Sequence, residues 1–188
     1  MCFLLNPQSP MTQYARLPFE QWPLDLLMDY ALKLHHRTIR REGPKTLERL
    51  QQLAADDASL QPVVEEFTTS LNALEQHLLK EENVLFPYLY ELFEAYESRT
   101  MLQPMHCGTI NNPIRVMMME HDEETERHRR IAQLTDDYTL EGKDSEKMRE
   151  TMERLKEFRD ALMEHIYIEN EVLFGRFSTI EEEIVIRY

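Results

Sequence analysis

The sequence predicts an all-α protein folded as an antiparallel four-helix bundle. Only four glycines occur in 188 residues, and they fall at or near expected breaks between helical segments. Apolar residues recur at alternating spacings of three and four along four long segments, which is the period of a helix face buried in a bundle. Each such stripe needs a partner stripe, so a bundle is the economical arrangement. We expect in addition a kinked first helix and a short C-terminal helix.

The composition fits one globular domain that buries its own core, with 42% hydrophobic and 30% charged residues. The formal charge of -14 argues against binding to nucleic acid or to an anionic membrane surface. No apolar run approaches the ~20 residues of a membrane span. Cys2 and Cys107 show no pairing pattern, and no signal peptide is evident. These features predict a cytoplasmic protein.

Prolines and glycines set the expected boundaries at the start of the chain. We expect residues 1–21 to form an extended arm, 22–175 the bundle and 176–188 a tail or short helix. The first helix should begin near Trp22, followed by a proline suited to the first turn. It should break or kink at Gly43-Pro44 and then resume.

The second helix is expected to start near Pro62 and to kink or end at Pro87, because proline removes a backbone donor and clashes with the preceding turn. The third should begin with Asn112 as N-cap and Pro113 in the first helical position, and run to about Tyr138.

The fourth helix is expected to start near Asp144 or Ser145 and to end at Gly175. Beyond it, Ser178 and Glu181 have the spacing of a capping box, which predicts a short terminal helix.

A ten-residue pattern occurs twice in the chain, as "HLLKEENVLF" from His77 and as "HIYIENEVLF" from His165. Each copy holds His-x-x-x-Glu, with Glu81 and Glu169 as the acids, and Val-Leu-Phe starts seven residues after the histidine. The echo indicates an internal duplication of a functional element. Both pairs lie on the predicted inward stripes. The stripe positions are Val63, Phe67, Ser70, Leu74, His77, Glu81 and Val84 in the second helix and Leu155, Phe158, Leu162, His165, Glu169 and Val172 in the fourth.

Two inward-facing carboxylates need an explanation. A buried carboxylate is unfavourable by several kcal/mol unless it is paired or binds a cation. Residues four apart on a helix lie about 6 Å apart on one face, so each His-Glu pair can bind the same metal or a close pair of metals. The third helix adds His121, on a stripe with Ile114, Met118 and Thr125, and the first adds His35-His36.

Imidazole and carboxylate ligands together suit iron, zinc or manganese. Four histidines and two glutamates exceed what one tetrahedral zinc can use. They fit two metals, each with two histidines, with both glutamates bridging. A bridging oxygen would bring each metal to five ligands and leave a position for a small molecule such as O2 or NO.

Four segments also carry a family resemblance: "WPLDLLMDYALKLHHR", "QHLLKEENVLFPYL", "GTINNPIRVMMMEHDEE" and "EHIYIENEVLF". In this order, over roughly residues 22 to 175, they resemble the hemerythrin-like (HHE cation-binding) domain of the di-iron proteins that repair iron-sulfur clusters. The resemblance implies two non-haem iron ions, a role in nitrosative and oxidative stress, and repair of damaged iron-sulfur centres. The implied ligands are His36, His77, Glu81, His121, His165 and Glu169, with both glutamates as bridges.

The chain departs from this family pattern in two places. Members often carry a separate N-terminal domain with an adjacent cysteine pair, whereas here a short arm with Cys2 precedes the bundle, so we do not carry over steps that depend on those cysteines. Gly175 stands where the pattern usually has proline, which concerns the helix end. Within the first helix, the apolar stripe favours His35 as the ligand, whereas the family register favours His36.

Other residues near the expected ligands have simpler interpretations. We expect Glu82 to lie on the surface, about 100° round the helix from Glu81. His128 is expected to be an outer-shell or surface residue, and the methionines at 117–119 to fill the core.

Three functions compete. The first is a di-iron stress protein that binds or reduces NO or reactive oxygen species and helps to repair iron-sulfur proteins. As an enzyme it would perform redox chemistry on NO, O2 or peroxide, with an external reductant, because no nucleotide or flavin motif is visible. The second is an O2 or NO carrier or sensor without turnover. A ferritin-like oxidase is disfavoured, because its Glu-x-x-His motif is absent around the histidines.

Overall fold

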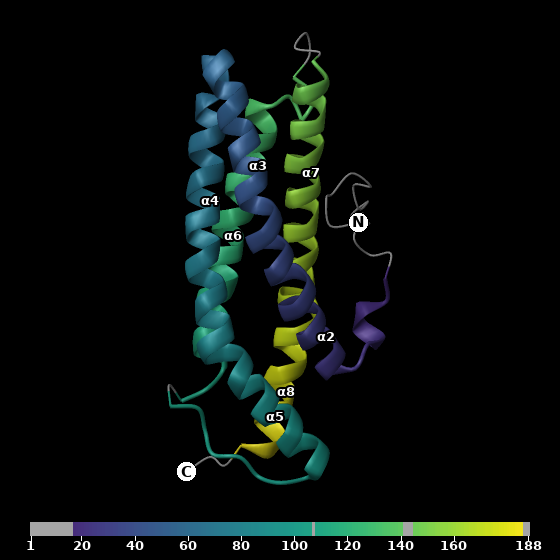
Figure 1. The fold of residues 1–188 in the computed structure, drawn as a ribbon. Coiled ribbons are helices and arrows are strands. Elements are labelled where there is room, and N and C mark those ends of the chain that lie inside the picture. The colour runs from purple at the N-terminus through teal and green to yellow at the C-terminus, as the bar shows by residue number, and fades with distance from the viewer. Residues whose placement is uncertain (1–16, 107, 141–144, 186–188) are drawn as a thin grey trace, which may run out of the picture.

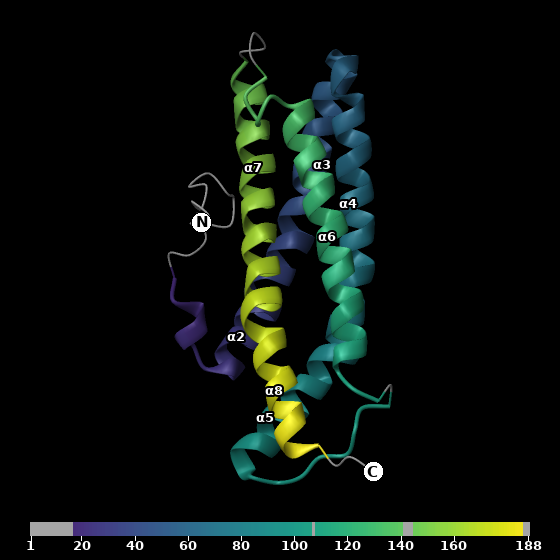
Figure 2. The same cartoon turned by 180° about the vertical axis from the view of Figure 1, so that it is seen from behind.

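The computed structural model describes residues 17–106, 108–140 and 145–185, so both cysteines and most of the expected arm lie outside the described residues. Four long helices run side by side and form an upright bundle (Figures 1 and 2). The described residues contain no β-strand, apart from an isolated bridge between Leu102 and Val185. Within the same residues, no helix is both long enough and apolar enough to span a lipid bilayer.

Three of the four helices are built from two α-helical parts joined by a π-helical segment. The first consists of α2 (Leu24–Tyr30), η2 (Ala31–His36) and α3 (Arg37–Asp56); the second of α4 (Gln61–Lys80), η4 (Glu81–Leu85) and α5 (Phe86–Ser98); and the fourth of α7 (Glu146–Tyr167), η5 (Ile168–Leu173) and α8 (Phe174–Ile184). The third is α6 alone (Asn111–Leu134). Short 3-10 turns, η1 (Phe19–Gln21) and η3 (Ala58–Leu60), precede the first and second helices.

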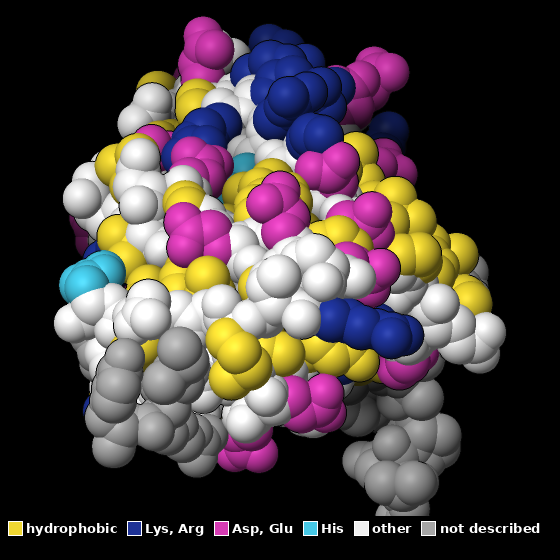
Figure 3. Space-filling view, turned by 90° about the horizontal axis from the view of Figure 1, so that it is seen from below, with side chains coloured by type: hydrophobic (Ala, Val, Ile, Leu, Met, Phe, Trp, Pro, Cys, Tyr) yellow, Lys and Arg dark blue, Asp and Glu magenta, His cyan; other side chains and the backbone are white. Residues whose placement is uncertain are grey.

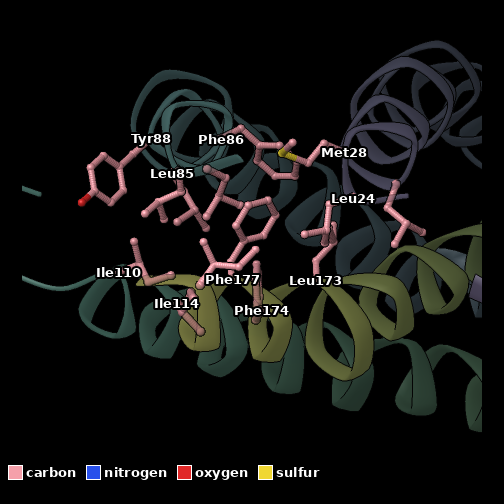
Figure 4. Packing of buried hydrophobic residues seen from close by; sticks show 14 of the residues in the cluster. Leu24, Met28, Leu85, Phe86, Tyr88, Ile110, Ile114, Leu173, Phe174 and Phe177 are labelled. Atoms are coloured by element: carbon pink, nitrogen blue, oxygen red, sulfur yellow. The ribbon is translucent and has the colours of Figure 1, made fainter. Parts of the chain in front are cut away.

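The apolar core has two parts, one at each end of the bundle. The foot cluster lies where α5 crosses α8, and Phe86, Phe174 and Phe177 point toward one another there (Figure 4). Its buried members include Phe19, Leu24, Leu27, Met28, Leu85, Phe86, Leu89, Ile110, Ile114, Leu173, Phe174 and Phe177. Seen from this end, apolar side chains are interspersed with acidic and basic ones on the surface (Figure 3). The upper cluster includes Ile39, Leu50, Leu60, Val63, Phe67, Leu74, Ile131, Leu155, Phe158 and Leu162.

The sequence predicts a break or a kink at Gly43-Pro44, and the break does not occur, because α3 continues through both residues. Pro44 is exposed, so water can reach the backbone carbonyl that the proline leaves without a helical partner. Gly43 serves packing instead. A Cβ atom there would lie 2.5 Å from Leu71 Cδ2 and 3.2 Å from Phe158 Cε2, so the missing side chain lets three helices approach closely.

Pro87 also fails to end its helix, since α5 continues to Ser98. The proline lies in the first turn of α5, directly after the π-helical segment η4. A π turn contains an extra residue, which leaves a backbone N–H without its usual i−4 carbonyl. Proline has no N–H, so it fits this position without losing a hydrogen bond.

The ends of the last two helices differ from the prediction as well. α6 begins at Asn111 and ends at Leu134, before a turn that contains Tyr138. Ser145 caps α7 as expected, and its hydroxyl accepts from the Met148 N–H. The predicted stop at Gly175 is wrong, because α8 runs through it to Ile184.

The capping box predicted at Ser178 and Glu181 is therefore also wrong. The Ser178 hydroxyl donates to the Phe174 carbonyl inside α8. The Glu181 carboxylate accepts from the Ile110 N–H at 2.9 Å and so ties α8 to the start of α6. The described part of the expected arm likewise differs, since Phe19 is fully buried within a 3-10 turn.

The π-helical segments shift the inward-facing positions by one residue. In the second helix the predicted stripe residue Val84 is 40% exposed, whereas Leu85 and Phe86 are buried. In the first helix the spacing from buried Ala31 to buried His36 is five residues, which is the period of one π turn. Inward positions must therefore be counted separately above and below these segments.

Candidate metal centre

The structure brings the predicted site residues into one buried layer between the foot cluster and the upper cluster. His36, His165, Glu81 and Glu169 are fully buried, and His77 and His121 are 3% and 2% exposed. All except His36 offer ligand atoms that lie within 4.8 Å of one another. The sixth residue joins them through Glu81, whose Oε2 is 3.4 Å from His36 Nε2. All four long helices contribute to this layer.

The four histidines form two pairs. His77 and His121 have ring centroids 4.7 Å apart, with their Nε2 atoms separated by 3.0 Å. The closest site histidine to His36 is His165, with ring centroids 5.2 Å apart. We call these the first pair (His77 and His121) and the second pair (His36 and His165).

Each glutamate reaches both pairs, one oxygen to each. Glu81 places Oε1 3.3 Å from His77 of the first pair and Oε2 3.4 Å from His36 of the second. Glu169 places Oε2 3.4 Å from His121 of the first pair and Oε1 3.6 Å from His165 of the second. This arrangement is the one expected of carboxylates that bridge two metal positions.

The layer contains polar atoms that need a ligand. Both carboxylate oxygens of Glu81 and Glu169, both ring nitrogens of His165 and Nε2 of His36 are buried without a hydrogen-bond partner among the described residues. Polar atoms buried in this way are strongly destabilising unless a partner is bound. Imidazole nitrogens and carboxylate oxygens are donors for a metal cation, so the residues present fit the group.

The protonation of the layer supports the same conclusion. Burial raises the pKa of Glu169 well above its ordinary value, and the nearby charge of Glu81 adds to the rise. Burial raises the pKa of Glu81, but the positive charge of His77 and the close approach of the His36 and His77 rings outweigh this effect, so the pKa is lowered. Two carboxylates so close cannot both ionise without a nearby cation. Burial, helped by the charge of His77, lowers the pKa of His121 to about 4 and keeps this ring neutral and able to ligate.

The structure distinguishes the two adjacent histidines of the first helix. His36 faces Glu81, whereas His35 lies 3.4 Å from Glu164 and its ring is 5.8 Å from that of His165. The apolar stripe favoured His35, and this residue is indeed buried; the extra residue in the π segment η2 also buries His36 and turns it toward Glu81.

Three of the histidines are held from outside the layer through Nδ1. His36 Nδ1 lies 2.9 Å from Glu82 Oε1, His77 Nδ1 2.9 Å from Glu120 Oε2, and His121 Nδ1 2.8 Å from Asn170 Oδ1. The expected surface role of Glu82 is therefore wrong. These contacts were missed because each joins two helices, although each holding residue is adjacent in sequence to a predicted ligand.

The inward face of α6 also differs from the prediction. Met117, Glu124 and His128 are buried on it, whereas Met118 and Met119 are 40% and 59% exposed. Glu124 and His128 belong to a second polar layer. It lies above the layer of the six predicted ligands, which we call the metal layer. The Ser70 hydroxyl donates to Glu124 Oε2 at 2.6 Å and lies 3.2 Å from His128 Nε2. The spacing of Glu124 and His128, three and seven residues after His121, was the signal that could have revealed this layer.

Comparison with known proteins decides the family. The hemerythrin HHE cation binding domain matches residues 27–177. The chain belongs to this family. The layer of predicted metal ligands lies inside the matched region, and the four helices form the hemerythrin-like bundle that the sequence predicted.

The relatives of this hemerythrin domain include bacterial repair proteins. A probable iron-sulfur cluster repair protein of Haemophilus influenzae is 30% identical over 154 residues, which is 80% of this chain and 63% of the relative. The iron-sulfur cluster repair protein YtfE of Citrobacter koseri is 28% identical over 177 residues, or 90% and 74% of the two chains. The YtfE protein of Musicola paradisiaca is 28% identical over 158 residues, or 82% and 65%. The chain thus spans about two thirds to three quarters of these relatives.

Proposed function

We propose that this protein is a non-haem di-iron protein that binds or reduces NO or reactive oxygen species and helps to restore damaged iron-sulfur centres. The observation that carries the proposal is the pair of glutamates, each of which has one oxygen toward each histidine pair. Two metal positions joined by two carboxylates account for all six buried side chains. The names of the relatives support the repair role.

The residues of the chain would divide the work as follows. The histidine pairs would each hold one iron, and Glu81 and Glu169 would hold both ions together and balance their charge. The bound irons would supply electron transfer to a small diatomic molecule. Apolar side chains close the layer from both ends: Leu74 and Leu162 in the upper cluster, and Phe86 and Phe174 in the foot cluster. These exclude water and large molecules, which suits a substrate of two atoms.

The alternative is an O2 or NO carrier or sensor without turnover, which the closed apolar surroundings of the layer would also suit. A repair assay on an iron-sulfur protein damaged by NO distinguishes the two functions. With the di-iron protein and an external reductant, the proposed function predicts recovery of the damaged cluster, and the carrier predicts reversible NO binding without recovery. The control is His77→Ala, which removes one ligand.

The first measurement is metal content per chain, on protein from cells grown with iron, together with the absorption spectrum before and after anaerobic reduction and NO addition. About two irons per chain, with bands that bleach on reduction and change with NO, are expected from a pair of histidine-bound ions joined by two carboxylates. One zinc per chain, or no metal, would overturn the di-iron proposal.

A further inference from the structure

The Nδ1 contacts of the site histidines run from each helix to the next one along the chain. His36 in the first helix contacts Glu82 in the second, and His77 in the second contacts Glu120 in the third. The next contact joins His121 in the third helix to Asn170 in the fourth. Each acceptor is a sequence neighbour of a site residue on its own helix. The result is a chain of three links around the bundle.

The two carboxylate links are anchored from their outer side. Arg40 Nη1 donates to Glu82 Oε1 at 2.6 Å, and Lys80 forms an ion pair with Glu120. A carboxylate can only accept a hydrogen bond, so Nδ1 of the histidine must carry the proton. The Nε2 lone pairs of His36 and His77 are thereby directed into the metal layer. Such an outer partner fixes the ring orientation and raises the basicity of the ligating nitrogen.

His165 is the exception, and the chain of links stays open there. Neither ring nitrogen of His165 has a hydrogen-bond partner among the described residues. Its sequence neighbour Glu164 reaches the first helix instead: the Tyr30 hydroxyl donates to it at 3.0 Å, and His35 Nε2 lies 3.4 Å away. The contact between the fourth helix and the first is therefore made by Glu164, beside His165, and it does not hold the His165 ring.

This asymmetry divides the two histidine pairs. Both members of the first pair, His77 and His121, are held through Nδ1, whereas only His36 of the second pair is held. We propose that Glu82, Glu120 and Asn170 are positioning residues for the metal ligands, and that the second pair releases its metal before the first. This inference rests on the proposed two-metal site.

Metal release to a chelator tests the proposal directly. The protein is loaded anaerobically with Fe(II), and a chromophoric chelator in excess reports release over time. Two phases of one metal each are expected, the fast one from the second pair. Glu82→Gln should accelerate the fast phase, and Glu120→Gln the slow phase, each by about 10- to 100-fold, because the amide is a weaker acceptor than the carboxylate.

Glu75 supplies a matched control. It bonds the same Arg40, at 3.0 Å through Nε, and lies on the same helix as Glu82, but its contacts in the structure are with Arg40 and not with His36. Glu75→Gln should leave both phases unchanged. If it accelerates release as Glu82→Gln does, or if the Glu82 and Glu120 variants change both phases equally, the positioning role is overturned.

A second readout separates positioning from a general loss of structure. In Zn(II)-loaded protein with 15N-labelled histidine, NMR should show slowly exchanging Nδ1 protons for His36, His77 and His121 and none for His165. Glu82→Gln should move only the His36 signal. Release of two metals in a single phase would refute the inference and leave the two-metal site intact, whereas binding of a single metal would refute the proposed function itself.

Discussion

The protein buries two polar layers on the same inward helix faces, and they differ in whether their buried carboxylates have hydrogen-bond partners. In the metal layer, Glu81 and Glu169 leave all four carboxylate oxygens without a hydrogen-bond partner among the described residues. In the layer above, Glu124 accepts from Ser70 at 2.6 Å and from Arg127 Nε at 2.9 Å. The buried acid is the same chemical group in both layers, but only one layer supplies its partners.

The difference distinguishes the candidate metal layer from a structural one. Unsatisfied buried acids persist in a folded protein when a bound partner offsets the loss of hydration. A buried acid that keeps its hydrogen-bond partners, as Glu124 does, needs no ligand. In the same layer, Nδ1 of His128 has no hydrogen-bond partner among the described residues. Burial and residue type alone would place both layers in the same class, so the hydrogen-bond partners make the distinction.

The largest difference in metal content and stability between the two layers should come from removing one histidine from each. His165→Leu is expected to lower the bound metal by one ion per chain or more, yet to stabilise the metal-free protein by about 1–3 kcal/mol, because two unpartnered nitrogens leave the core. His128→Leu should leave the metal content unchanged and reduce stability. Elemental analysis and urea unfolding after chelator treatment measure both effects. Equal metal loss in the two variants would remove the distinction between the layers.

Glu124→Ala tests the structural layer itself. The substitution removes the acceptor of Ser70 and the ion-pair partner of Arg127, so unfolding should require about 3 kcal/mol less free energy. The metal content should stay at the value of the parent protein. Thermal unfolding of the metal-loaded protein, with elemental analysis of the same sample, provides the check; a loss of metal would mean that the two layers act as one.

The structural layer should also make stability depend on pH. Burial, with the charges of Arg159 and Arg127, lowers the pKa of His128 to about 3. As the pH falls, the unfolded chain therefore binds a proton at His128 before the folded protein does. The contribution of this residue to the free energy of unfolding is fully present above about pH 6.5 and is lost as the pH drops toward 3. By pH 5 the loss from this residue is about 2 kcal/mol.

His128→Gln should abolish that part of the pH dependence, because glutamine does not titrate. The measurement is the free energy of unfolding of the metal-free protein at pH 7 and pH 5. His106→Gln is the matched control, since His106 is exposed and its removal should leave the difference unchanged. A His128 variant that keeps the full loss of stability would show that another group is responsible.

The smallest effect is expected from Ser70→Ala. The change deletes one hydroxyl between Glu124 and His128, while Arg127 continues to bond the acid, so the loss of stability should be about 1 kcal/mol. Chemical denaturation resolves a change of this size. A loss as large as that of Glu124→Ala would place the main support of the acid on the serine.

The fold and the inward position of the site residues could be predicted from the sequence, because both follow from the regular spacing of apolar residues along a helix. His77, Glu81, His165 and Glu169 repeat on apolar stripes, and the structure places all four in the buried layer. Their role as ligands stays a prediction. The helix ends were harder, since Pro44, Pro87 and Gly175 all lie within continuing helices.

The partners of the site residues were not accessible, because they come from other helices. Glu82 and Glu120 each stand beside a predicted ligand in sequence and have the appearance of solvated acids. Their contacts with His36 and His77 depend on how adjacent helices are rotated. The π-helical segments change that rotation, and no residue type in the sequence marks them.

The three π-helical segments have a consequence for the molecule as a whole. η2, η4 and η5 all lie at the level of the metal layer, and each inserts one residue into the helical period. In the first, second and fourth helices, the side chains of the foot and of the upper bundle are therefore out of phase by one residue, whereas α6 passes through the layer as a regular α-helix. Three of the predicted ligands, His36, Glu81 and Glu169, lie within these segments, where the regular packing of apolar side chains is interrupted. Deleting a single residue from one of these segments would restore a regular helix and rotate every side chain below it by about 100°.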